Sequence, residues 1–117
     1  MQIVKNEGLF RVLLLLCTLV IEFLATTTIH IDVVESLWDK ANHFSAFFVL
    51  YILLSFAFRK LSIGSKVILL LAYGMQIEIV QSFIDGRYFS LLDVVADSIG
   101  IFIGVVVYWF LGEKFRN

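Results

Sequence analysis

The chain has 117 residues, of which 61% are hydrophobic and none is proline, and its formal net charge is −1. Its mean hydropathy of +0.97 is too high for a soluble domain, and its length suits a single domain. A chain of this charge offers no basic surface, so nucleic-acid binding has no support. The composition therefore predicts one integral membrane domain over residues 1–117.

Four apolar segments have the length needed to cross a bilayer. They run over residues 9–28, 41–58, 67–84 and 92–112. About 20 helical residues, at about 1.5 Å each, cross about 30 Å of hydrocarbon. The connections between the segments are short, so consecutive helices should pack antiparallel. We therefore expect an all-α, polytopic bundle of four transmembrane helices.

The charged residues divide between the two sides of this bundle. With four spans, the N-terminus, the connection 59–66 and the C-terminus share a side and hold seven of the nine Lys and Arg residues. Lys40 and Arg87 are the other two. The positive-inside rule then predicts cytoplasmic termini. We expect a multi-pass protein of the plasma membrane, in a bacterial cell. Eight of the ten acidic residues fall in the opposite, outer half.

Three of the four spans carry a stripe of polar and small residues. The stripes consist of Asp39, Lys40 and His43 in the second span, Gly74, Glu78, Gln81 and Asp85 in the third, and Asp93, Asp97, Gly100 and Gly104 in the fourth. Spacings of three and four place the members of a stripe on one helical face. The glycine pair permits close helix approach, so this face should meet another helix. We expect the three stripes to converge at one outer site.

Glu78 is the member of this site that is hardest to explain by structure alone. It lies about two helical turns inside its span, between Ile77 and Ile79. A carboxylate at that depth needs a partner, a proton or a ligand. Structural roles remain open for others: Asp93 as a helix N-cap, and His43 and Arg87 as residues of the membrane interface.

Three motifs in this order resemble those of the VanZ-like family. They are D-K-A-N-H-F at residues 39–44, G-M-Q-I-E-I-V-Q at 74–81 and R-Y-F-S-L-L-D-V-V-A-D-S-I-G at 87–100. In one departure, Asp97 occupies a position where the family usually has asparagine. The resemblance implies a small integral membrane protein linked to glycopeptide (teicoplanin) resistance or envelope physiology, and it implies no particular reaction.

The charges of the site suggest what it binds. With His43 neutral, the charges of the site are the four carboxylates of Asp39, Glu78, Asp93 and Asp97 against Lys40 and Arg87, which leaves a net charge of −2. A carboxyl group therefore takes a proton, His43 is charged, or a cation binds. Our first hypothesis is a site that binds or processes an envelope lipid or cell-wall precursor. The residues expected to handle protons or charge are His43, Glu78 and Asp93, and those expected to contact the ligand are Lys40, Arg87, Asp39, Gln81 and Asp97.

Two other functions remain as alternatives. One is a non-enzymatic interaction protein that alters the access of antibiotics or enzymes to the cell surface. The other is a proton- or ion-coupled carrier. A carrier is disfavoured because Arg11 and Thr18 are the only polar residues expected within the cytoplasmic halves of the spans.

The sequence leaves open whether the site is catalytic. Ser45 and Ser55 look isolated, so no pair of nucleophile and base is expected. A divalent cation held by His43, Glu78 and Asp93 is a further alternative, because imidazole and carboxylate groups are common metal ligands. The sequence does not indicate an oligomeric state.

Overall fold

In the computed structural model, the described residues form four α-helices. They are α2 (Glu7–Thr26), α3 (Asp32–Ala57), α4 (Ile63–Gln81) and α5 (Leu91–Phe115). The structure describes residues 6–26, 32–83 and 91–115, and for residues 26, 32–42 and 112–115 it describes the backbone only. These ranges contain no strand, which confirms the predicted all-α fold.

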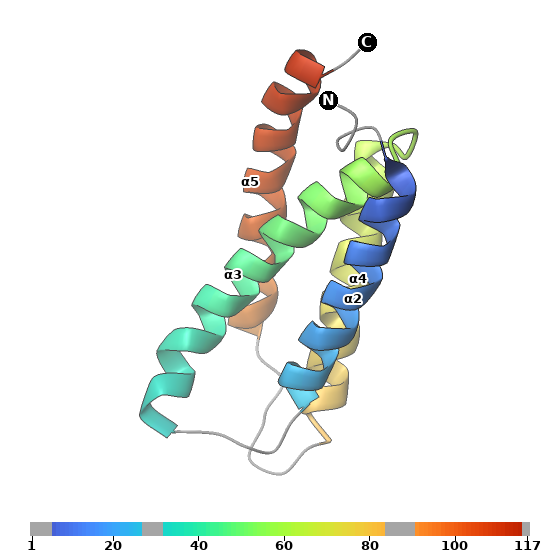
Figure 1. The fold of residues 1–117 in the computed structure, drawn as a ribbon. Helices are drawn as coiled ribbons and strands as arrows, with labels where there is room; N and C mark the ends of the chain where they lie inside the picture. Colours follow the sequence, from blue (N-terminus) through green and yellow to red (C-terminus); the bar gives the residue numbers. More distant parts are fainter. Residues whose placement is uncertain (1–5, 27–31, 84–90, 116–117) are drawn as a thin grey trace.

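Helix α3 lies at the centre of the bundle and packs against the three others, most extensively against α5. Helices α2 and α5 lie on opposite sides of it, with α4 beside α2 (Figure 1). Helix α2 begins and α5 ends at the same end of the bundle at which the chain passes from α3 to α4 (Figure 1). Consecutive helices therefore run in opposite directions, as predicted. The cytoplasmic location of that end remains a prediction.

The contact between α3 and α5 depends on the two glycines of the fourth stripe. A Cβ atom at Gly100 would overlap the backbone carbonyl of Phe44, and one at Gly104 would lie 2.8 Å from Cβ of Tyr51. Both glycines therefore face α3, as predicted. Because Asp97 lies three residues before Gly100, this close approach also turns Asp97 toward α3.

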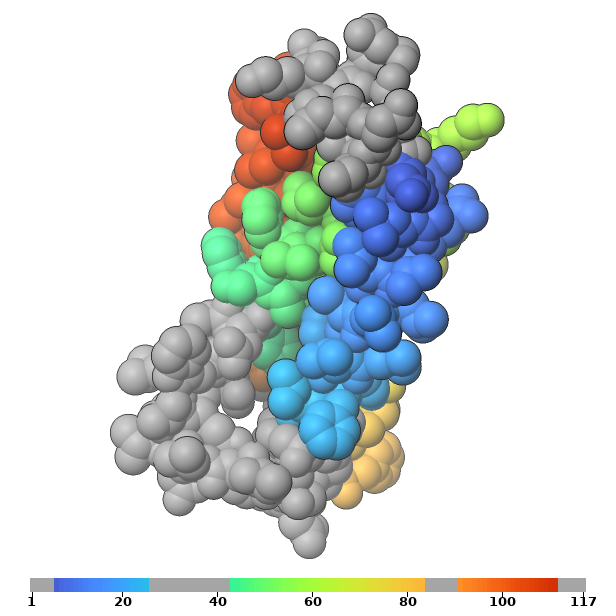
Figure 2. Space-filling view, viewed as in Figure 1, coloured from blue at the N-terminus to red at the C-terminus, as the bar shows by residue number. Residues whose placement is uncertain are grey.

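The outer surface of the bundle is apolar. Figure 2 shows α2 along one side of the molecule with its outward side chains uncovered, and Leu15, Leu19 and Phe23 are each more than half exposed. Among the described residues, α2, α4 and α5 contain stretches long and apolar enough to cross a membrane. The apolar part of α3, His43–Ala57, is shorter. The exposed side chains are those expected of a protein surrounded by lipid.

All four helices begin before the predicted spans, and the difference is largest for α3 and α4. Helix α3 begins at Asp32 rather than at residue 41, and α4 begins at Ile63 rather than at residue 67. At α4 the reason is local, because the Ser62 hydroxyl accepts a hydrogen bond from the backbone N–H of Ser65 and caps the helix. The earlier start places Lys66 inside the helix, where it is buried.

Candidate functional site

Four residues of the predicted site lie together in the structure. His43 comes from α3, Glu78 from α4, and Asp93 and Asp97 from α5. The three carboxylate residues are buried, and the side chain of His43 is 12% exposed. The stripes therefore converge as expected for these four, which we call the His43 cluster. Their chemical roles remain predictions.

The imidazole of His43 is the centre of the cluster. Its Nδ1 lies 2.7 Å from Oδ1 of Asp97, which is the length of a strong hydrogen bond. Its Nε2 lies 3.8 Å from Oε2 of Glu78 and 3.7 Å from Oδ2 of Asp93. Both distances exceed the ~2.7–3.2 Å of a hydrogen bond. One side of the ring thus has a hydrogen-bonded carboxylate, and the other faces two carboxylates at a longer distance.

Neighbouring residues fix the position of this imidazole. The ring of Phe47, one turn along α3, lies almost parallel to it with ring centroids 6.4 Å apart. The second oxygen of Asp97 lies against Gly74, where a Cβ atom would be only 2.6 Å from it. The glycine of the third stripe therefore provides space for the carboxylate that binds His43. This explains why a residue without a side chain lies one turn before Glu78.

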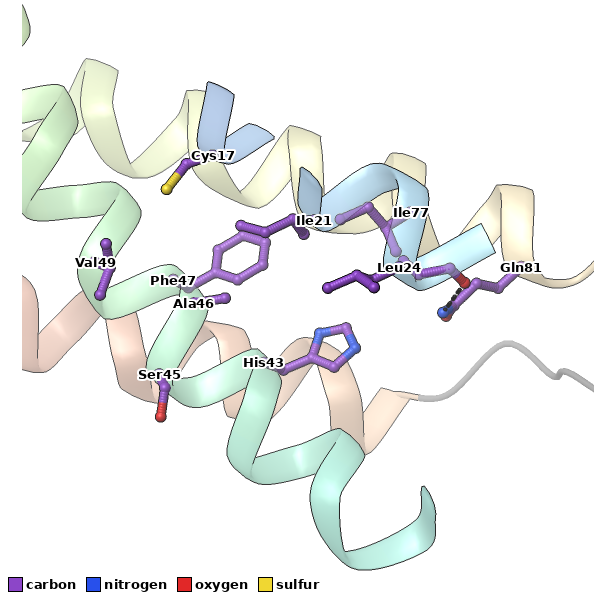
Figure 3. Close-up of a pocket in the computed structure, with 11 residues that line it drawn as sticks. Cys17, Ile21, Leu24, His43, Ser45, Ala46, Phe47, Val49, Ile77 and Gln81 are labelled. Atoms are coloured by element: carbon purple, nitrogen blue, oxygen red, sulfur yellow. Dashed lines mark hydrogen bonds between the residues drawn. The ribbon is translucent and has the colours of Figure 1, made fainter. Parts of the chain in front are cut away.

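A pocket of about 420 Å³ adjoins the cluster between α2, α3 and α4. Figure 3 shows Ile21 and Leu24 of α2 on one side and His43 of α3 on the other. The lining is mainly apolar, and His43 contributes to it directly. His43 therefore belongs to both the polar cluster and the apolar pocket, which no pattern in the sequence indicated.

The other predicted site residues have different positions. Gln81 lines the pocket and donates a hydrogen bond of 2.8 Å from Nε2 to the carbonyl of Ala25, so it joins α4 to α2. For Asp39 and Lys40 only the backbone is described, within the first turns of α3. Arg87 lies outside the described residues. Any contact of these three with a ligand remains a prediction.

Further polar contacts hold α2 against α4 on the same side as the pocket. The hydroxyl of Tyr73 donates to the carbonyl of Thr18 at 2.6 Å, and Nε2 of Gln76 donates to Oε2 of Glu22 at 2.9 Å. Hydrogen bonds of this kind contribute to helix association in lipid, where apolar side chains gain little by meeting each other. They keep the pocket wall formed by α2 in place.

A second polar group lies near the other end of the bundle. Nζ of Lys66 donates to Oγ of Ser55 at 2.9 Å, and it lies 4.6 Å and 5.3 Å from the ring centroids of Tyr108 and Tyr51. The expectations that Ser55 is isolated and that this half lacks further polar residues are therefore wrong. Lys66 and Ser55 are both buried, and neither lines the described pocket. The serine cap of α4 was the sequence signal that could have placed Lys66 inside the helix.

Comparison with known proteins identifies the family. The sequence model of the VanZ/LLP1 family matches residues 3–112. No curated protein and no solved structure matches the chain. Because the match covers nearly the whole sequence, the chain belongs to the VanZ/LLP1 family, in agreement with the resemblance of its motifs.

Proposed function

We propose that, in this small membrane protein of the VanZ/LLP1 family, the His43 cluster and the adjoining pocket form one binding site for an amphiphilic molecule of the cell envelope. The molecule would be a lipid or a lipid-linked cell-wall precursor. Its apolar chain would occupy the pocket, and its polar group would lie at the cluster.

The position of His43 supports this proposal. Its ring is hydrogen-bonded within the cluster and also lines the pocket. A cavity of about 420 Å³ falls within the ~300–1,000 Å³ of small-molecule sites, which are mostly apolar with a few convergent polar groups. A ligand with one apolar and one polar part matches this division better than a fully water-soluble one.

The polar group of the ligand is expected to be a phosphate or a carboxylate. Lys40 lies three residues before His43 on α3, hence on the same side of that helix. We propose that Lys40 and Arg87 bind the anionic group, because charge-assisted hydrogen bonds to phosphate are strong. In this proposal, and when no metal ion occupies the cluster, His43 and Glu78 accept or donate protons if the bound molecule is processed.

The pocket can be tested with a pair of matched substitutions on α2. Ile21→Trp places a bulky ring in the pocket, whereas Leu19→Trp adds the same ring at an outward position that is 57% exposed. Each protein is purified in native lipid with its folding checked, and the co-purifying lipids are identified by mass spectrometry. A species retained by the wild type and by Leu19→Trp, but lost from Ile21→Trp, supports the proposal. Identical lipids in all three samples contradict it.

A second experiment separates a chemical site from a surface-interaction role. Glu78→Gln keeps the shape of a fully buried side chain and removes its charge. Lost glycopeptide resistance or envelope integrity at normal expression supports a site that depends on this charge. Wild-type behaviour favours the non-enzymatic interaction protein.

A further inference from the structure

His43, Glu78 and Asp93 present three potential metal-ligating atoms to one point inside the bundle. One ligand atom from each residue lies within 4.8 Å of the other two. The residues come from α3, α4 and α5, so the point is fixed by three helices rather than by a loop. Sites built on helices hold their ligands more accurately than sites built on loops.

The hydrogen bond from Nδ1 of His43 to Asp97 prepares His43 to act as a ligand. A neutral imidazole carries a proton on one nitrogen and a lone pair on the other. Because a carboxylate accepts hydrogen bonds, Asp97 at 2.7 Å from Nδ1 fixes the proton on that nitrogen. The lone pair of Nε2 then points toward Glu78 and Asp93. A metal-bound histidine usually donates its other ring N–H to a carboxylate, a backbone carbonyl or a water molecule.

The distances on the Nε2 side are those of ligands that share an ion. Four ligands at about 2.1 Å from a tetrahedral ion lie about 3.4 Å from each other. The separations from Nε2 are 3.8 Å to Glu78 and 3.7 Å to Asp93. They are a few tenths of an ångström longer than this spacing and clearly longer than a hydrogen bond. The chosen oxygens of Glu78 and Asp93 lie within 4.8 Å of each other, so rotation of the two carboxylates is needed to enclose an ion.

We propose that His43, Glu78 and Asp93 bind one divalent transition-metal ion through Nε2 and one oxygen of each carboxylate, with Asp97 as a positioning residue. One imidazole and two carboxylates suit Zn²⁺ or Mn²⁺. Three protein ligands leave a coordination position for another molecule. The ion also offsets the negative charge of the cluster, which favours an anionic group there. The metal site does not depend on the identity of the amphiphile, so it is tested separately.

The direct test is metal content. The full chain, purified in native lipid and treated with a chelator, is incubated with Zn²⁺ or Mn²⁺, and bound metal is measured by mass spectrometry. We expect about one ion per chain in the wild type, and its loss in His43→Ala and Glu78→Gln. Glu22→Gln is the matched control, because this acid contacts Gln76 outside the cluster. A wild type that retains neither metal overturns the proposal, as does a His43→Ala variant that binds metal normally.

Two measurements remain decisive if the variants fold poorly. X-ray absorption of the metal-loaded wild type should show nitrogen and oxygen ligands, and a spectrum without an imidazole ligand refutes the site. Asp97→Asn keeps a hydrogen-bond acceptor for Nδ1 and removes the charge. It should weaken metal affinity by about 10- to 100-fold, as is typical for such supporting residues. Unchanged affinity in a folded Asp97→Asn protein excludes the positioning role.

Discussion

Gly100→Ala is the substitution whose effect on stability follows most directly from the structure. The added methyl group would overlap the carbonyl of Phe44 and lie 3.1 Å from the backbone nitrogen of Phe48. Both obstacles belong to the backbone of α3, so no side-chain rotation removes them. The two central helices must separate, which loosens the packing around Asp97 and His43 as well.

The expected magnitude comes from two opposing terms. Alanine is favoured over glycine within a helix by about 0.5–1 kcal/mol. Overpacking a close contact costs about 1–3 kcal/mol, and we take the upper end because backbone atoms block the methyl group. The net destabilisation is then about 2 kcal/mol. Gly64→Ala gains the first term alone, because nothing lies within 4 Å of its added methyl group.

The two alanine variants should therefore change stability in opposite directions. Their free energies of unfolding are compared with that of the wild type by denaturant titration in detergent micelles, followed by circular dichroism. We expect Gly100→Ala to unfold at a lower denaturant concentration and Gly64→Ala at an equal or higher one. Equal stability of the two variants would refute the close contact between α3 and α5.

Two further predictions concern charge. Lys66→Met should change the free energy of unfolding by less than about 1 kcal/mol, because removing a buried charge offsets the lost contacts with Ser55 and the tyrosines. Lys66→Glu should cost about 3–5 kcal/mol, because it places an uncompensated negative charge at the same buried position. The same titration measures both variants, and equal costs would contradict this account. Reporter fusions should place Asn117 in the cytoplasm and residues 29–40 outside it, and an external C-terminus would contradict the predicted orientation.

The sequence predicted the helices and the four residues of the His43 cluster because both depend on local spacing. Residues three and four apart share a face, so Glu78 and Asp97 could be assigned to helix contacts without a structure. The glycine pair indicated which face of α5 is buried. These signals are strong because lipid penalises any charge that turns outward.

Features that depend on the distance between helices were not predicted. The burial of Lys66 depends on the rings of Tyr51 and Tyr108, which both contact its Nζ and come from different helices. Hydropathy alone assigned Lys66 to a connection, since a lysine near the end of a span usually reaches the interface. The pocket beside His43 likewise arises from the spacing of three helices and leaves no periodic pattern in the chain.

The short apolar part of α3 has a consequence for the surrounding membrane. The apolar stretch of α3 found among the described residues is 43–57, and the span in the sequence, 41–58, covers about 27 Å at about 1.5 Å per residue. This is less than the thickness of a typical hydrocarbon layer of about 30 Å. A span shorter than the hydrocarbon layer can be accommodated by local thinning of the bilayer. His43 lies near the beginning of this span, so we expect headgroups and water to come close to the cluster, and an amphiphile to enter the pocket directly from the bilayer.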